Sequence, residues 1–160
     1  MTQHYYTPNP ESEIIEEKIS CKLFNKQVEF ISASGLFSKE HIDAATYILI
    51  HHADLTNAKK ILDLGCGWGP VVTTLLLFKN QLGLDSEAQV YACDVNLRAI
   101  TYTKKNLFKY NLHAKVTLSN IFEKILDNDF DCILTNPPYS AGRKICFSFI
   151  EDSFNHLIKG

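Results

Sequence analysis

Two short stretches of the sequence combine residue types that can bind a nucleotide-like ligand and act on it. The first is Asp63-Leu64-Gly65-Cys66-Gly67, which ends one apolar run and precedes another, Val71 to Phe78. This order predicts a strand, a tight loop and a helix. The glycines allow a sharp turn and a close approach of ligand to backbone, and the N-terminus of the helix presents free N–H groups. The pattern predicts a binding crevice at the carboxyl end of a parallel strand.

The acidic residues near this loop indicate which ligand it binds. In the nicotinamide fingerprint a third glycine stands further along, whereas Gly69 comes one residue early and Asp85 lies in a polar segment. Asp94 instead ends the next apparent strand, which begins at Gln89, and its carboxylate there can accept both hydroxyl groups of a ribose. Asp63 can bind an ammonium group directly or through water. Taken alone, the loop is also compatible with a glycine turn in another kind of α/β protein, or with a nicotinamide oxidoreductase.

The second stretch is Asn136-Pro137-Pro138-Tyr139, which follows the strand-like apolar run Phe130 to Thr135. Two prolines fix φ and remove two backbone donors, so the carbonyl between them is expected to face outward in a rigid loop. That carbonyl and the Asn136 amide oxygen can accept both hydrogens of a planar NH2 group, which aims the nitrogen lone pair at an electrophile. Tyr139 offers a flat face on which a base or an amide can stack. A proline-rich strand exit with a surface tyrosine is the alternative reading without a function.

Length and composition restrict the class of protein. A chain of 160 residues with 46% hydrophobic content predicts one domain with a real core. The net charge of −2 provides no global field that favours nucleic acid. Five cysteines without a Cys-x-x-Cys spacing indicate reduced thiols in a cytoplasmic protein, and we predict no metal site. We also predict no membrane association, because no apolar run is long enough to span a bilayer.

The N-terminal part of the chain predicts a hairpin and a helix. Ile19 to Phe24 and Gln27 to Ser32 are expected to form two strands around a turn at Asn25-Lys26. Ser38 is expected to cap a helix from Lys39 to about His52. One face of that helix would carry its apolar residues, Ile42, Ala45, Ile48 and Leu49.

After the glycine loop, strand-like runs alternate with helical stretches. The strand that ends at Asp94 is followed by a helix from about Asn96 to Tyr110, a strand from Ala114 to Leu118, and later a helix from Arg143 to Ile158. This alternation predicts a parallel, doubly wound sheet. The helix that follows Asp94 carries three basic residues on one face, which we interpret as a solubilising surface: Arg98, Lys105 and Lys109.

Together, these motifs resemble those of class I S-adenosylmethionine-dependent methyltransferases. Gly35-Leu36-Phe37-Ser38 followed by Ile42-Asp43 matches the signature that precedes the cofactor domain in the small-domain (MTS-type) class. That class includes bacterial enzymes that methylate the 2-amino group of guanine in ribosomal RNA, and archaeal relatives, whose lead-in the stretch Tyr5 to Pro10 resembles. The resemblance covers roughly residues 28–160, and it places the turn Gly35–Ser38 over the cofactor site.

The resemblance implies a fold and a division of the chain. The fold would be an α/β, doubly wound Rossmann-like parallel sheet of the class I methyltransferase type, with an N-terminal β-hairpin and helix. Residues 1–18 would form an extended segment and residues 19–160 the methyltransferase domain. Within that domain, residues 19–58 would form the hairpin and helix, and residues 59–160 the cofactor-binding core.

The resemblance also implies site residues, with S-adenosylmethionine as the cofactor. The catalytic residues would be Asn136, Pro137, Pro138 and Tyr139. The cofactor-binding residues would be Phe37, Asp63, Gly65, Cys66, Gly67, Asp94, Val95, Asn120, Ile121 and Asn136. Members of the class commonly carry Asp where this chain has Asn120, and Asn can still hydrogen-bond an adenine edge.

The expected reaction is N-methylation of an exocyclic amino group, with guanine N2 in RNA favoured. A protein glutamine methyltransferase, an adenine-N6 methyltransferase and a non-catalytic cofactor-binding partner subunit are the alternatives. Arg143 and Lys144 follow the Asn-Pro-Pro-Tyr loop and are candidates to contact a phosphate of the substrate.

The expected sheet is incomplete at its C-terminal side. Sheets of this class have seven strands, and we recognise only four core strands in the sequence. The strand that ends at Thr135 is therefore expected to form an exposed sheet edge. Either the sequence is truncated, or a protein partner or a second copy of the chain would cover this edge.

Overall fold

The computed structural model describes residue 8 and residues 12–159. The lead-in that begins at Tyr5 lies outside the described residues, apart from Pro8, as does most of the expected extended segment before residue 12. In the part described, the elements are β1 (Glu16–Leu23), β2 (Lys26–Ala33), α1 (Ala44–His52), β3 (Lys60–Leu64), α2 (Pro70–Leu77), β4 (Gln89–Asp94), α3 (Leu97–Lys109), β5 (Lys115–Leu118), β6 (Cys132–Thr135), the short 3-10 helix η1 (Tyr139–Ala141) and α4 (Arg143–Phe154).

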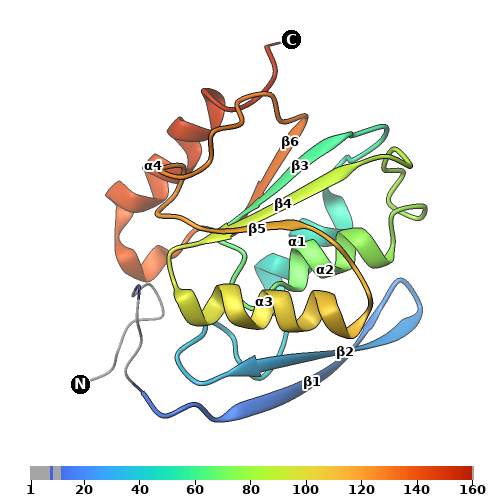
Figure 1. The fold of residues 1–160 in the computed structure, drawn as a ribbon, viewed down its shortest axis with the longest axis vertical. Helices are drawn as coiled ribbons and strands as arrows, with labels where there is room; N and C mark the ends of the chain where they lie inside the picture. Colours follow the sequence, from blue (N-terminus) through green and yellow to red (C-terminus); the bar gives the residue numbers. More distant parts are fainter. Residues whose placement is uncertain (1–7, 9–11, 160) are drawn as a thin grey trace.

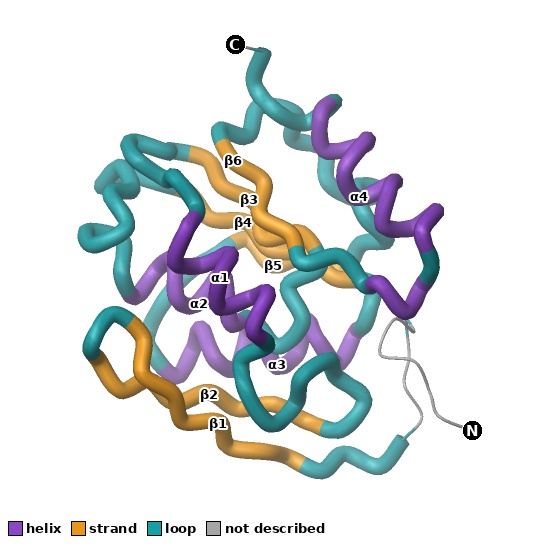
Figure 2. Tube along the Cα trace, turned by 180° about the vertical axis from the view of Figure 1, so that it is seen from behind, coloured by secondary structure: helices purple, strands orange, loops and turns teal. Residues whose placement is uncertain are grey.

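A parallel sheet forms the centre of the fold. Within residues 12–159 its strand order is β5-β4-β3-β6, and every neighbouring pair is parallel. The helices α1, α2 and α3 cover one face of this sheet and α4 covers the other, while the β1–β2 hairpin lies outside the three-helix layer (Figures 1 and 2). The structure confirms the predicted α/β class with an N-terminal hairpin and helix. None of the helices described has both the length and the apolar character needed to cross a membrane.

The sequence of the two central strands explains why both faces of the sheet are covered. Successive side chains of a strand point to opposite faces. Ile61 and Val90 therefore join the core under α1, α2 and α3, whereas Leu62 and Tyr91 join the core under α4. Strands that are apolar on both faces fit a parallel sheet with helices on each side.

The hairpin turns one residue earlier than expected. Phe24 and Asn25 occupy the turn with φ values of 45° and 64°, and Leu23 pairs with Lys26. Two consecutive left-handed residues match the right-handed twist of the flanking strands. Leu23, on the same face of β1 as Ile19, is fully buried.

The helix α1 begins later than expected, and Ser38 does not cap it. Asp43 is the cap, because its Oδ2 atom accepts hydrogen bonds from the backbone N–H groups of Ala45 (3.1 Å) and Thr46 (3.2 Å). Ser38 instead lies in a left-handed turn with φ of 48° and donates its hydroxyl to a nearby carbonyl. The expected apolar face is only partly right, because Ile42 and Leu49 pack against the core whereas Ala45 is exposed. Thr46 and Ile50 are the buried positions of α1, while Ile48 is 58% exposed.

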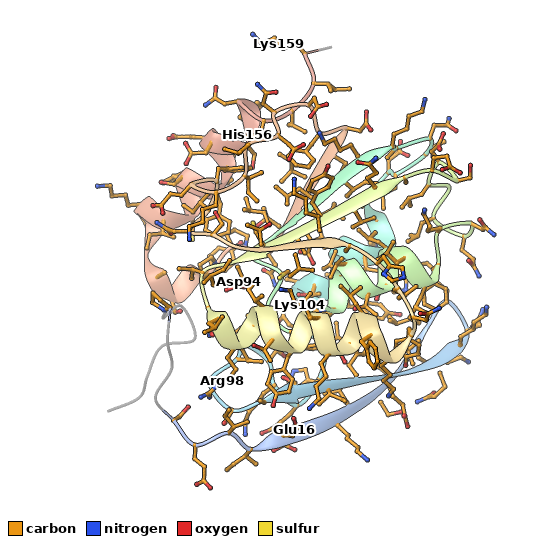
Figure 3. The ribbon with its side chains drawn as sticks, in the orientation of Figure 1. Glu16, Asp94, Arg98, Lys104, His156 and Lys159 are labelled. Carbon is orange, nitrogen blue, oxygen red and sulfur yellow. The ribbon has the colours of Figure 1, made fainter. Side chains whose placement is uncertain are left out.

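The basic face of α3 does not form a solubilising surface, because it holds the hairpin. Lys105 pairs with Glu16, and Lys109 lies 3.2 Å from a carboxylate oxygen of Glu29. Arg98 is buried between α3 and the hairpin and donates to the Ser34 carbonyl at 2.6 Å. Figure 3 shows Arg98 and Glu16 on the side of α3 that faces the hairpin. The acidic partners lie on strands far away in the sequence, so the helix pattern alone could not reveal them.

A buried asparagine completes this attachment. Asn106 has no exposed surface. Its Oδ1 atom accepts from the N–H of Ile31 (2.8 Å), and its Nδ2 atom donates to the carbonyls of Ile31 (2.9 Å) and Trp68 (2.8 Å). One side chain thus joins β2, α3 and the loop that follows β3.

The strand β6 lies at the edge of the described sheet. It pairs with β3 on one side. On its other side, just before β6 begins, Phe130 forms a parallel bridge with Leu157, with backbone hydrogen bonds of 3.0 Å to His156 and Ile158. The segment after α4 therefore starts to run alongside this edge. Coverage of Cys132–Thr135 by a protein partner stays a prediction.

We expect Asn106→Ala to lower the free energy of unfolding by about 2 to 4 kcal/mol, because it leaves three buried backbone groups without their partner. Urea unfolding would measure this loss. Lys104→Ala, at an exposed position of the same helix (Figure 3), is the matched control and should change the free energy little. Equal effects of the two substitutions would contradict the role given to Asn106.

Candidate active site

The loop after β3 is shaped by hydrogen bonds to a single carbonyl and by its glycines. The N–H groups of Gly65 and Cys66 both donate to the Cys93 carbonyl at 2.9 Å. A Cβ atom on Gly67, whose φ is 56°, would meet no atom within 4 Å. A Cβ atom on Gly69 would lie 3.0 Å from the Thr103 hydroxyl. Gly67 therefore lets a ligand approach the backbone, and Gly69 lets α3 pack closely against the loop.

A cavity of about 370 Å³ opens at the carboxyl ends of β3, β4 and β6. This is the size and place expected for a small-molecule site in a parallel sheet. Its walls come from five segments: Leu36 to Ser38, Asp63 to Trp68, Cys93 to Asn96, Ser119 with Ile121, and Asn136 to Ser140, with further residues from α1, α2, α3 and α4.

Asp94 is fixed at the end of β4. Its Oδ2 atom accepts from the N–H of Gly67 (2.9 Å), and its Oδ1 atom accepts from the N–H of Asn96 (2.8 Å). Burial raises the pKa of Asp94, and these N–H groups oppose that shift. Figure 3 shows Asp94 beside the start of α3. A carboxylate held there lies in the cavity wall, where the sequence predicts contact with ribose hydroxyls.

Asp63 is buried in the cavity wall beneath the glycine loop. It is 2% exposed, and its Oδ2 atom accepts from the N–H of Val72 at 3.0 Å. Burial and the nearby charge of Asp94 raise the pKa of Asp63 to about 7, although the Val72 N–H opposes the shift. An ammonium group bound in the cavity would offset the loss of solvation that burial imposes on the ionised Asp63 carboxylate.

The structure places the turn Gly35–Ser38 over the cavity. Asn96 donates its side-chain Nδ2 to the Gly35 carbonyl at 3.3 Å, and the indole Nε1 of Trp68 donates to the Phe37 carbonyl at 3.1 Å. The rest of the turn, from Leu36 to Ser38, contributes to the cavity wall.

The Asn-Pro-Pro-Tyr loop forms another part of the wall. Asn136 donates its amide nitrogen Nδ2 to Asp43 Oδ2 (2.9 Å) and to Thr46 Oγ1 (3.0 Å). Tyr139 stands at the start of η1 and is 76% exposed. The loop thus combines an oriented amide inside the cavity with an accessible aromatic ring at its rim.

The structure brings all but one of the predicted site residues to this cavity, and their roles there stay predictions. The residues that line it are Phe37, Asp63, Gly65, Cys66, Gly67, Asp94, Val95, Ile121, Asn136, Pro137, Pro138 and Tyr139. Asn120 is exposed and does not line it, and its Nδ2 atom donates to Glu123 at 2.7 Å. Ile121 adopts a φ of 49°, and Ser119 and Ile121 face the cavity in place of the residue between them.

Sequence reasoning missed several residues of the site. Asn96 caps α3 through its Oδ1 atom, and its place shortly after a strand-end acid was a usable signal. Asp43 stands in the Ile42-Asp43 signature, although the signature does not reveal its contact with Asn136. Phe149 of α4 comes within 3.2 Å of the position a Cβ atom on Gly65 would take. No sequence pattern predicts this contact between Phe149 and Gly65, because it depends on how α4 crosses the sheet.

The chemistry of the cavity fits S-adenosylmethionine. Asp63 and Asp94 offer carboxylates to an ammonium group and to ribose hydroxyls. Among the described residues the wall contains no lysine or arginine, the side chains that usually bind phosphate groups. The cofactor carries an ammonium group and a ribose but no phosphate, so the available partners match it. Gly67, where a Cβ atom would meet open space, leaves room for the bound molecule.

A family model described as methyltransferase small domain matches residues 27–160. The chain belongs to this family. The match and the fold confirm the prediction of an S-adenosylmethionine-dependent methyltransferase domain.

Relatives of known sequence and structure extend this comparison. The chain is 33% identical to the uncharacterized protein YbxB of Bacillus subtilis over 98% of its own length and 77% of that protein. It is 30% identical to ribosomal RNA small subunit methyltransferase C of Idiomarina loihiensis, over 89% of the chain and 41% of the relative. It therefore spans about two fifths of that curated methyltransferase.

A solved structure shares the fold. The 16S rRNA N2 G1207 methyltransferase (RsmC) of T. thermophilus, in complex with AdoMet and guanosine, superposes with a TM-score of 0.77 and 23% identity. The match covers 94% of this chain and 41% of that protein.

We expect S-adenosylmethionine to bind more tightly as pH rises through about 7, where Asp63 loses its proton. The raised pKa means that the free protein holds this carboxyl in its neutral form below that pH, and the ionised form attracts the ammonium group. Calorimetric titration from about pH 6 to about pH 8 would measure the trend.

Asp63→Asn is the control for this prediction, because it cannot ionise. In this variant the affinity for S-adenosylmethionine should be lower at about pH 8, and the rise in affinity through about pH 7 should be absent. The free energy of unfolding of the free protein should also fall as pH rises from about 4 to about 7, because the unfolded chain ionises this carboxyl near pH 4 while the folded protein keeps its proton until about pH 7. The same pH profile in both proteins would remove Asp63 from the binding model.

Proposed function

We propose that the chain catalyses S-adenosylmethionine-dependent N-methylation of an exocyclic amino group, with guanine N2 in RNA as the target. This proposal rests on the orientation of the Asn136 side-chain amide. Its amide nitrogen is already bonded to Asp43 and Thr46, so the amide oxygen is the atom available to a substrate. Asn136 belongs to the same cavity wall as Asp94 and the glycine loop.

The residues of the loop would hold the amine rather than activate it with a strong base. When bound, the cofactor supplies an electrophilic methyl group on a sulfonium sulfur. The Asn136 amide oxygen and the Pro137 carbonyl accept the two amine hydrogens, which directs the nitrogen lone pair at that methyl group. The N–C bond forms as the S–C bond breaks, and the ammonium product gives a proton to water. Positioning of this kind supplies much of the rate enhancement in such a site.

Two features support RNA as the substrate. Tyr139 is 76% exposed beside the cavity, where its ring can stack on a base turned out of its strand. Arg143 and Lys144 are exposed at the start of α4, directly after this loop, where they can contact phosphate groups. The relative from Idiomarina is a ribosomal RNA methyltransferase by name, and the T. thermophilus neighbour holds guanosine.

Methyl transfer from labelled cofactor to separate RNA, DNA and protein fractions tests the substrate class. Label in RNA, located at guanine N2 by nucleoside analysis, is the expected result. Label on adenine N6 or on protein glutamine would overturn the choice of guanine, because the Asn-Pro-Pro-Tyr loop can hold any planar NH2 group. No transfer to any fraction, with the cofactor bound, would favour a non-catalytic partner subunit.

We expect Asn136→Ala to lower turnover by about 100-fold or more, because it removes an acceptor aligned with the reacting amine. The affinity for S-adenosylmethionine should change little, since Asp63, Asp94 and the glycine loop are untouched. Steady-state kinetics and calorimetric titration would measure the two quantities separately.

Asn120→Ala is the matched control, because the structure places this asparagine outside the cavity wall. It should leave turnover and cofactor affinity close to those of the unchanged chain. If Asn136→Ala weakened cofactor binding and retained turnover, Asn136 would be a cofactor ligand and not a catalytic residue.

A further inference from the structure

Two side chains of the α1 region contact the catalytic loop from outside it. Asp43 Oδ2 lies 2.9 Å from Asn136 Nδ2, and Thr46 Oγ1 lies 3.0 Å from the same nitrogen. The two residues are 93 and 90 positions away from Asn136 in the sequence. They therefore belong to the start of α1, whereas Asn136 belongs to the loop after β6.

These contacts decide which way the amide of Asn136 faces. The two ends of an asparagine amide have nearly the same shape, but one donates hydrogen bonds and the other accepts them. A carboxylate only accepts, so Asp43 binds the NH2 end and repels the carbonyl end. Among the described residues no hydrogen bond occupies the Asn136 oxygen, because Asp43 and Thr46 both bond to its nitrogen.

The Asp43 carboxylate, which sets the orientation of the Asn136 amide, is itself held in place. The same Oδ2 atom accepts from the backbone N–H groups of Ala45 and Thr46 and thereby caps α1. Asp43 cannot turn away from Asn136 without releasing the first turn of the helix. Thr46 is 7% exposed, so its hydroxyl is confined as well.

We propose that Asp43 and Thr46 are positioning residues that hold the Asn136 amide with its oxygen directed at the substrate amine. The proposal rests on the proposed function, because it assigns a purpose to the orientation of Asn136. An amide turned the other way would present NH2 to an NH2 substrate, and two donors cannot bind each other. The helix unit that precedes the cofactor core would thus set the polarity of the catalytic loop.

The variants for the test separate this contact from the helix cap. Asp43→Ser keeps a strong N-cap residue, but its shorter side chain does not reach Asn136. Thr46→Val keeps the volume and removes the hydroxyl. Asp43→Asn keeps an acceptor oxygen and can also present NH2, so it should lie between Asp43→Ser and the unchanged chain. Asp54→Ser is the matched control, because Asp54 is exposed and, among residues 12–159, its side chain bonds to Thr56 in its own connector.

The first readout is kinetic and uses the full chain with the RNA that it methylates. Asp43→Ser and Thr46→Val should each lower kcat by about 10- to 100-fold, the loss expected when a reacting group is held in the wrong orientation. Calorimetry with S-adenosylmethionine should give an unchanged Kd. A merely structural role would lower the melting temperature or the cofactor affinity and leave kcat of the folded fraction unchanged, and that result would overturn the proposal.

The second readout needs no substrate. The side-chain NH2 of Asn136 gives a pair of cross-peaks in a 1H–15N spectrum, which Asn136→Asp identifies by deleting them. We expect the pair to shift in Asp43→Ser and in Thr46→Val, and to stay in place in Asp54→Ser. A pair that does not move in either variant would show that Asp43 and Thr46 do not hold the amide.

The two readouts also separate this inference from the proposed function. If the unchanged chain methylates RNA and Asn136→Ala does not, but both new variants keep full kcat, only the positioning role fails. If the unchanged chain methylates no RNA, the proposed function fails, and the spectrum alone then decides whether the amide is held. If Asp43→Ser does not fold, Thr46→Val carries both readouts, because it leaves the cap in place.

Discussion

The Cys93 carbonyl is the atom on which the site depends. By accepting the N–H groups of both Gly65 and Cys66, it bends the chain sharply where β3 ends and keeps that bend beside the end of β4. The bend then brings the Gly67 N–H to the carboxylate of Asp94. Parallel strands end at the same edge of a sheet, so β6 delivers Asn136 to the same place. The double hydrogen bond and the parallel strand ends together bring the two carboxylates and the amide to one cavity.

The outer layer of the fold shapes the cavity as much as the sheet does. Asn96 and Trp68 hold the turn between β2 and α1 by its backbone carbonyls. Asp43 holds the loop after β6 from the start of α1. Each contact joins a segment before the cofactor core to a segment within it. The turn after β2 and the start of α1 are therefore part of the candidate active site.

The elements with local sequence signals were predicted correctly. The predictions were wrong where contacts between residues far apart in the sequence determine the structure. Apolar runs and glycines located the strands, the loop and the parallel sheet, because periodicity and backbone freedom are properties of short segments. Ser38 and Asp43 are both good helix caps, but Ser38 donates its hydroxyl to the His41 carbonyl, and the Asp43 carboxylate binds the first N–H groups of α1. Asn120 was assigned by its position in a family pattern, but the left-handed Ile121 beside it accompanies a turn that leaves Asn120 outside the cavity. The basic residues of α3 looked like a surface because the acidic residues that pair with Lys105 and Lys109 lie in the hairpin.

The attachment of the hairpin through Asn106 has a consequence for how this fold can change. Asn106 binds the backbone N–H and carbonyl of Ile31, and neither group depends on which side chain residue 31 carries. Substitutions at the outward-facing positions of β1 and β2 therefore leave the Asn106 hydrogen bonds to Ile31 intact. A hairpin that keeps the buried Leu23, Val28 and Phe30 and the acidic partners Glu16 and Glu29 can therefore vary on its outer face while it stays attached to the same cofactor core.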